Sequence, residues 1–141
     1  MPDLWLILHF IGVALGVGTG FAMLTLGLAT RDMSPADRGA FMRRASMVGV
    51  NGSIGLLLLI VSGVGLLLTR GVAEVMAWGG AMFHIKLTLV VVLIGVFGYM
   101  QVLVRKFKSG DAAAAARLPV VSKIMLLLSL AIVVFAVLAF H

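Results

Sequence analysis

The sequence predicts an all-α integral membrane protein, a four-helix bundle whose single transmembrane domain covers residues 1–141. Hydrophobic residues make up 62% of the chain and charged residues 11%, which is more apolar surface than one water-soluble core can bury. Four apolar runs are each long enough to cross a bilayer. Most of the basic residues lie in two of the three connections between these runs, a pattern typical of membrane topology.

The first span is expected over residues 4–29, a helix about 39 Å long against a hydrocarbon core of about 30 Å. A cleaved signal peptide is not expected, because the run is too long and is preceded by Asp3 without any Lys or Arg. Ser34 and Pro35 then predict the cap and first turn of a short interfacial helix. This helix leads into the second span, over residues 45–69.

The connection over residues 71–80 carries Glu74 and Trp78, and a Trp there is typical of an interfacial anchor. The third span is expected over residues 81–104 and the fourth over residues 118–140. The five alanines after Asp111 are strong helix formers and should extend the fourth helix beyond the bilayer. Pro119 is expected either in the first turn of that span or at a kink.

The distribution of basic residues predicts the orientation. Eight of them lie in the first and third connections: Arg31, Arg38, Arg43, Arg44, Arg105, Lys106, Lys108 and Arg117. These two connections should be cytoplasmic, which places both termini on the outer, periplasmic side of a bacterial inner membrane. The expected partners are the lipid bilayer and further copies of the chain or a larger membrane complex. Nucleic acid is not expected, because the basic residues do not form a soluble face.

Three histidines fall at the outer ends of the predicted helices: His9, His84 and the terminal His141. On a helical wheel Gly16 and Gly20 lie about 20° from His9, and Gly95 lies about 20° from His84. A haem b between two facing helices needs such room beside each imidazole ligand. His9 and His84 are therefore the candidate iron ligands, while the terminal histidine is expected to be solvated.

Helix packing is the alternative explanation of these features. Small residues spaced in this way also let lipid-embedded helices approach closely without a cofactor, and a single membrane histidine can bond a neighbouring carbonyl or hydroxyl. The polar residues of the second span, Asn51, Ser53 and Ser62, are expected to hold helices together. Lys86 lies about 160° from His84 on the wheel. It could either extend to the interface or, with Arg70, pair with an anionic group such as a haem propionate. Arg70 is equally explained as a helix-end anchor.

Several chemistries are excluded by composition. There is no cysteine for thiolate or iron–sulfur chemistry, and no predicted span contains a carboxylate. Neither a phosphate-binding glycine loop before a helix nor a serine-nucleophile motif is present, so hydrolysis and phosphoryl transfer are not expected. A copper site would have to use histidine and methionine, for which Met76 and Met82 near His84 are the candidates.

Three short stretches resemble the HemJ-type protoporphyrinogen oxidase family of small four-helix bacterial membrane proteins, with a looser resemblance to CopD-like copper-related domains. They are Leu8-His9-Phe10-Ile11, Met42-Arg43-Arg44 and Phe83-His84-Ile85-Lys86-Leu87. The resemblance implies a haem-ligand role for His9 and places His84 and Lys86 in the haem or porphyrin site. The expected function is thus haem binding for electron transfer or porphyrin oxidation, an oxidoreductase if the chain is an enzyme. The alternatives are a non-catalytic accessory or assembly subunit and a copper-handling protein that uses His9, His84 and a methionine.

Overall fold

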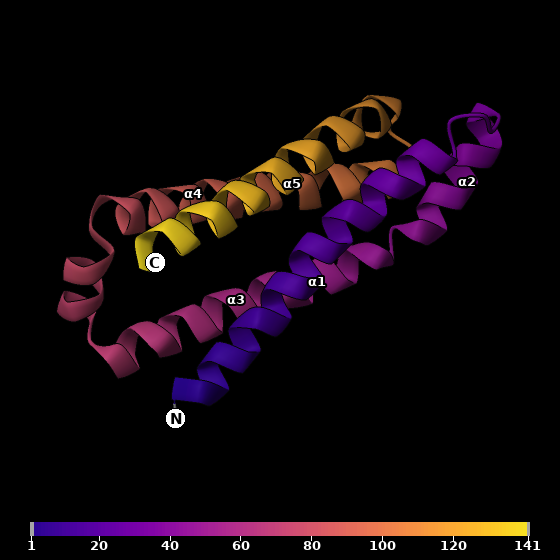
Figure 1. Cartoon of the computed structure of the whole chain (residues 1–141). Helices are drawn as coiled ribbons and strands as arrows, with labels where there is room; N and C mark the ends of the chain where they lie inside the picture. Colours follow the sequence, from indigo (N-terminus) through magenta and orange to yellow (C-terminus); the bar gives the residue numbers. More distant parts are fainter. Residues whose placement is uncertain (1, 141) are drawn as a thin grey trace.

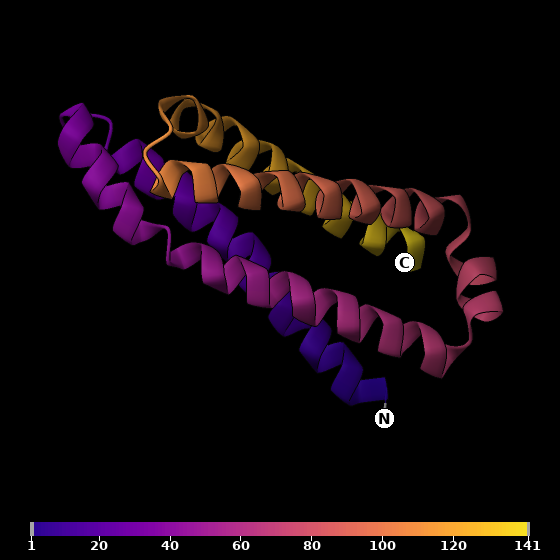
Figure 2. The ribbon, with the colours of Figure 1, turned by 180° about the vertical axis from the view of Figure 1, so that it is seen from behind.

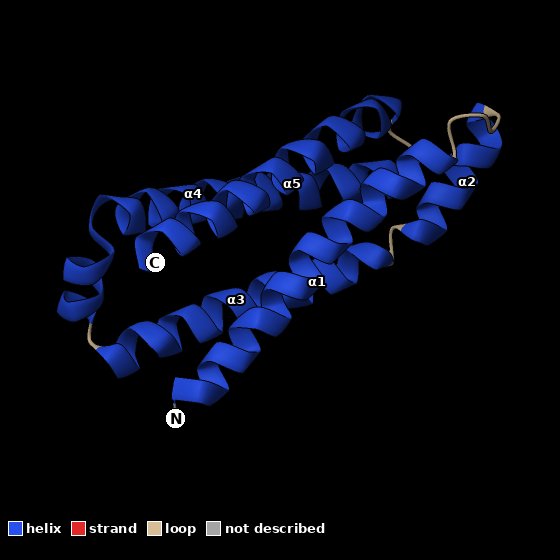
Figure 3. Cartoon of the chain, in the orientation of Figure 1, coloured by secondary structure: helices blue, strands red, loops and turns tan. Residues whose placement is uncertain are grey.

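The computed structural model describes residues 2–140, with side chains over residues 3–139, and all the regular secondary structure of this part is helical. Its elements are α1 (Pro2–Ala29), α2 (Pro35–Ala45), α3 (Val48–Arg70), α4 (Val72–Lys108) and α5 (Ala112–Phe140) (Figures 1 and 3). Four stretches are long and apolar enough to cross a membrane: Asp3–Ala29, Pro35–Arg70, Val72–Lys108 and Ala112–Ala139. This confirms the prediction of an all-helical chain with four helices long and apolar enough to span a membrane.

The helices form two antiparallel pairs. The most extensive contacts join α1 to α3 and α4 to α5, and the pairs meet where α1 crosses α5 (Figures 1 and 2). The start of α1, the α3–α4 connection and the end of α5 lie at one end of the bundle, called here the terminal end (Figure 1). The opposite end, called the α2 end, gathers α2, the end of α4 and the start of α5.

Glycine lets α1 and α3 pack almost backbone to backbone. A Cβ atom added to Gly55 would lie 2.7 Å from the backbone nitrogen of Gly16 and 2.9 Å from the carbonyl oxygen of Gly12. Farther along the same pair, the ring of Trp5 covers the position where Gly65 would carry a side chain. Close approach through small residues is how apolar helices associate in lipid, where there is no hydrophobic force between them.

The second pair uses larger side chains. Leu103 of α4 and Ala114 and Val121 of α5 form a buried cluster near the α2 end. A second cluster, nearer the terminal end, joins Val75 and Phe83 of α4 to Ala139 of α5. The two clusters fix α5 against α4 at both ends, and Pro119 lies inside the continuous helix α5.

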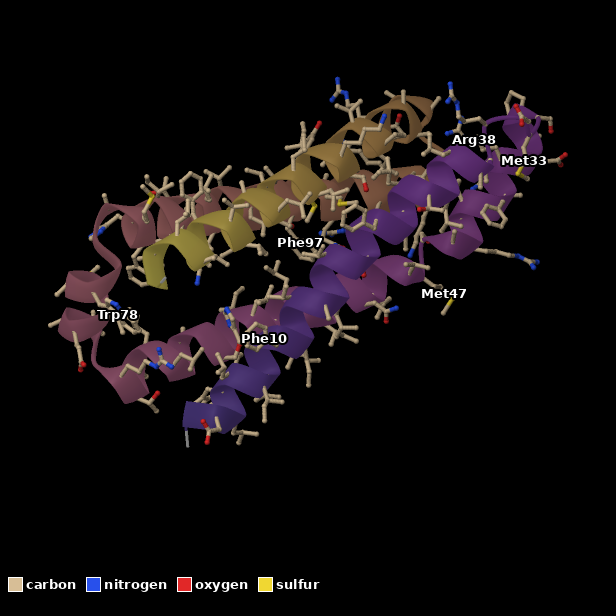
Figure 4. The ribbon with its side chains drawn as sticks, viewed as in Figure 1. Phe10, Met33, Arg38, Met47, Trp78 and Phe97 are labelled. Atoms are coloured by element: carbon tan, nitrogen blue, oxygen red, sulfur yellow. The ribbon has the colours of Figure 1, made fainter. Side chains whose placement is uncertain are left out.

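Local sequence signals explain most helix ends. Ser34 caps α2, since its hydroxyl accepts a hydrogen bond from the Asp37 backbone N–H at 3.3 Å, as the sequence indicates. The connection over residues 71–80 differs from the simple link expected, because residues 72–79 are helical and belong to α4. Gly71 (φ 88°) and Gly80 (φ 54°) bound this segment, and both adopt positive φ angles that favour glycine. Figure 4 shows Trp78 on it, at the terminal end.

Candidate functional site

A cavity of about 1610 Å³ lies between the two helix pairs and runs from the terminal end to the α2 end. Its lining comes from all five helices and is mostly apolar, with Phe97 of α4 between the pairs (Figure 4). Small-molecule sites usually occupy about 300–1,000 Å³, so this cavity has room for a large apolar ligand. His9, Arg70 and Lys86 line it near the terminal end.

His9 is held by Ser62 across the α1–α3 interface. The His9 Nδ1 atom lies 2.9 Å from the Ser62 hydroxyl oxygen, and Ser62 is completely buried. The single hydroxyl proton of Ser62 is donated to the Leu58 carbonyl, one turn back in α3. The serine oxygen can therefore only accept from His9, so Nδ1 carries the proton. The Nε2 atom of a neutral His9 is then unprotonated, which is the form of a ring nitrogen that can bind a metal or accept a hydrogen bond.

The surroundings of His9 leave its ring accessible. Gly63 stands next to it in α3, where an added Cβ would lie 3.6 Å from His9 Cε1. Lys86 of α4 lines the same end of the cavity, and the lysine is half-buried. Two polar groups from opposite helix pairs thus line the terminal end of the cavity.

His84 lies outside the cavity that His9 lines. It is exposed, it does not line the cavity, and its Nδ1 atom donates to the Gly80 carbonyl at 2.8 Å. That carbonyl belongs to the residue at which α4 kinks, so the hydrogen bond from the imidazole stabilises the kink. The separation of about 160° expected between His84 and Lys86 puts the lysine on the cavity side and the histidine outside. The structure thus separates the two histidines that the sequence suggested as a ligand pair.

The glycines predicted beside the two histidines also differ in whether they line the cavity. Gly16 and Gly20 line the cavity as His9 does, and a Cβ on Gly20 would lie 2.8 Å from Leu126 Cδ1 of α5, so this glycine also takes part in the contact between α1 and α5. Gly95 is exposed, and nothing lies within 4 Å of the position of an added Cβ. Of the sequence-derived site residues, the structure therefore gathers His9, Arg70, Lys86, Gly16 and Gly20 around one cavity and leaves His84 and Gly95 outside it.

The residues of the suggested copper site do not come together. Met76 and Met82 are exposed and do not line the cavity that contains His9. Within the described residues no group of three or more His, Cys, Asp or Glu side chains could hold a metal ion. The expectation for His141 falls outside the described residues.

Sequence reasoning missed two features of the cavity. It treated Ser62 only as a helix-packing residue, although the hydroxyl selects the His9 tautomer. It also passed over Lys123, which lies six residues beyond Arg117 in an apolar stretch and lines the cavity near the α2 end. A lysine within an apolar run is a signal in its own right, as it is for Lys86.

No family model matches the chain, and no curated protein or solved structure matches it either. Function must therefore be argued from the residues of the cavity.

Proposed function

We propose that the chain is a multi-pass protein of the bacterial inner membrane, with both termini outside, that binds a b-type haem or a related porphyrin in the cavity between its helix pairs. His9 is the iron ligand, and the task is electron transfer or porphyrin oxidation. One observation carries the proposal. A histidine whose Nδ1–H is held by Ser62 lines a large apolar cavity together with Lys86 and Arg70.

The hydrogen bond from His9 to Ser62 supports the ligand role. Histidines that bind metals usually donate their second ring N–H to an oxygen, which fixes the tautomer and the orientation of the ring. The Ser62 hydroxyl is such an acceptor, and its own proton is committed to the Leu58 carbonyl. The buried serine therefore orients His9 before any ligand arrives.

The charges in the cavity suit the two carboxylates of a haem. Among the described residues that line it, six are Lys or Arg and none is Asp or Glu. Lys86 and Arg70 lie at the same end as His9 and can pair with propionate groups. When bound, haem supplies a one-electron redox centre, while the apolar walls keep water away from it. In this form of the hypothesis His9 is the sole protein ligand and His84 stays at the kink.

Absorption spectra of the detergent-purified protein, oxidised and then reduced, test the ligand assignment. His9→Ala should abolish the Soret band after expression with ample haem. His84→Ala is the matched control, because it removes the same type of side chain from outside the cavity and should keep the band. Loss of haem in both variants would restore the paired-ligand hypothesis, and full retention in His9→Ala would refute a ligand role for His9.

The role of Lys86 needs its own test, because a lysine near a helix end can simply extend to the interface. Lys86→Gln should weaken haem binding about tenfold or more, the loss expected for one buried charge-assisted hydrogen bond. The dimethyl ester of haem lacks the carboxylates, so its binding should not change. Lys106→Gln is the control, since Lys106 is on the same helix but does not line the cavity. Equal weakening for haem and its ester would contradict propionate pairing.

A non-catalytic subunit of a larger complex is the second candidate, and the outer face of α4 favours it. Gly95 and Gly98 leave open space there, on the same side as the exposed His84. Small residues on an exposed membrane helix suit the docking of another helix. Gly95→Leu should then release the chain from larger assemblies in native electrophoresis. Assemblies that persist in this variant would count against the docking role.

A further inference from the structure

The α2 end of the cavity carries a second group of cations, away from His9. Four basic side chains line it there: Arg31, Arg38, Lys108 and Lys123. They come from the α1–α2 connection, from α2, from the end of α4 and from a position about three turns into α5 (Figure 1). Figure 4 shows Arg38 beside Met33 at this end of the bundle. Segments distant in sequence thus contribute four basic residues to the cavity lining at this end.

The general excess of basic residues on one side of a membrane does not account for this group. Five other basic residues at the same end do not line the cavity: Arg43, Arg44, Arg105, Lys106 and Arg117. Lys123 also lies too deep to be a loop residue, eleven positions beyond the start of α5. A selected subset of the cations therefore faces the space between the helix pairs.

No carboxylate compensates these charges inside the cavity. Asp111 caps α5 instead, accepting from the backbone N–H groups of Ala113 at 2.9 Å and Ala114 at 3.3 Å. Asp37 lies in the first turn of α2, and neither it nor Asp32 lines the cavity. Within residues 2–140 the four cations have no ion-pair partner on the cavity side, so an external anion would complete the site.

We propose that this end of the cavity binds an anionic phospholipid, with its phosphate among the four cations and an acyl chain along the apolar walls between the helix pairs. Basic pockets between transmembrane helices are suited to such headgroups. A free phosphate ion would use the cations but not the apolar space below them, whereas a membrane lipid uses both. This site does not depend on the haem proposal, because it uses other residues at the opposite end.

Binding of phosphatidylglycerol to the purified full chain in mild detergent, followed by native mass spectrometry, tests the proposal. The double substitution Arg38→Gln and Lys123→Gln should weaken this binding roughly 30-fold, if each cation near the headgroup contributes its usual share. Arg44→Gln with Lys106→Gln removes the same charge from the same end but outside the cavity, and should leave binding unchanged. Lys123→Arg keeps the charge and should retain the lipid.

Three results would overturn the inference. Equal losses in the cavity and control variants would indicate general surface attraction rather than a site. Phosphatidylcholine bound as well as phosphatidylglycerol would show that the site does not select a headgroup with net negative charge, which contradicts binding of an anionic lipid. Displacement of the lipid by inorganic phosphate alone would show a site for the free ion. If the double variant fails to fold, Lys123→Gln alone, compared with Lys106→Gln, puts the same question to one cation.

Discussion

Gly55→Ala should destabilise the bundle, because α1 and α3 have no room for a methyl group at this position. The added Cβ would lie 2.7 Å from the Gly16 nitrogen and 2.9 Å from the Gly12 oxygen. Carbon atoms normally keep about 3.5 Å or more from such neighbours, so the overlap is roughly 0.6–0.8 Å. Both neighbours are backbone atoms and cannot rotate away. The helices must therefore separate, at the cost of about 1–3 kcal/mol typical of overpacking.

Gly95→Ala is the matched control for this measurement. It makes the same chemical change in another membrane helix, where nothing lies within 4 Å of the new methyl group. Both variants gain the helix propensity of alanine over glycine, up to about 1 kcal/mol, so their difference isolates the packing cost. Unfolding in mixed micelles with increasing SDS, followed by circular dichroism, gives the two free energies. If Gly55→Ala is as stable as Gly95→Ala, the close approach of α1 and α3 is wrong, and the glycines beside His9 need another explanation.

Two further predictions concern the His9 environment and the topology. Ser62→Ala removes the acceptor for His9 Nδ1–H and should lower haem affinity about 10- to 100-fold, the usual cost of losing an orienting partner of a metal ligand. Ser53→Ala is the control in the same haem titration, because it removes a cavity-lining hydroxyl that bonds Gly49 within α3 and not His9; equal affinities would contradict the orienting role. The cysteine-free chain also allows single-cysteine mapping, in which Glu74→Cys should react with an impermeant thiol reagent in spheroplasts and Ser109→Cys should not. Labelling of Ser109→Cys but not of Glu74→Cys would show that the orientation is the opposite of the one proposed.

Much of the fold was predictable from the sequence because membrane helices have strong local signals. The length of each apolar run sets a span, and the cap formed by Ser34 and Pro35 marks the start of α2. The helical segment over residues 72–79 was less evident. Its glycines suggested only a connection, whereas Gly71 and Gly80 in fact turn the chain at either end of a short helix.

The site was predictable only in part, because the wheel gives relative angles within a helix but not which face turns inward. Lys86 lines the cavity, whereas His84 is exposed and lies outside it. In a water-soluble helix the polar face identifies the outside, but lipid-facing and protein-facing sides of α4 are both apolar. The similar depth of His9 and His84 in the predicted membrane could therefore not show whether the two side chains face each other. That depended on how the two helix pairs pack.

The two lysines inside the apolar spans, Lys86 and Lys123, argue that the cavity holds more than hydrocarbon. They lie on different helices and near opposite ends of the bundle, yet both line the same cavity. A charged side chain in a span is costly unless it meets water, a counter-ion or a ligand, and no carboxylate among the described residues lines this space. If packing alone had shaped the bundle, apolar residues would serve better at both positions. The lysines are explained most simply if anionic groups enter the cavity from both ends, a propionate beside His9 and a lipid phosphate near α2.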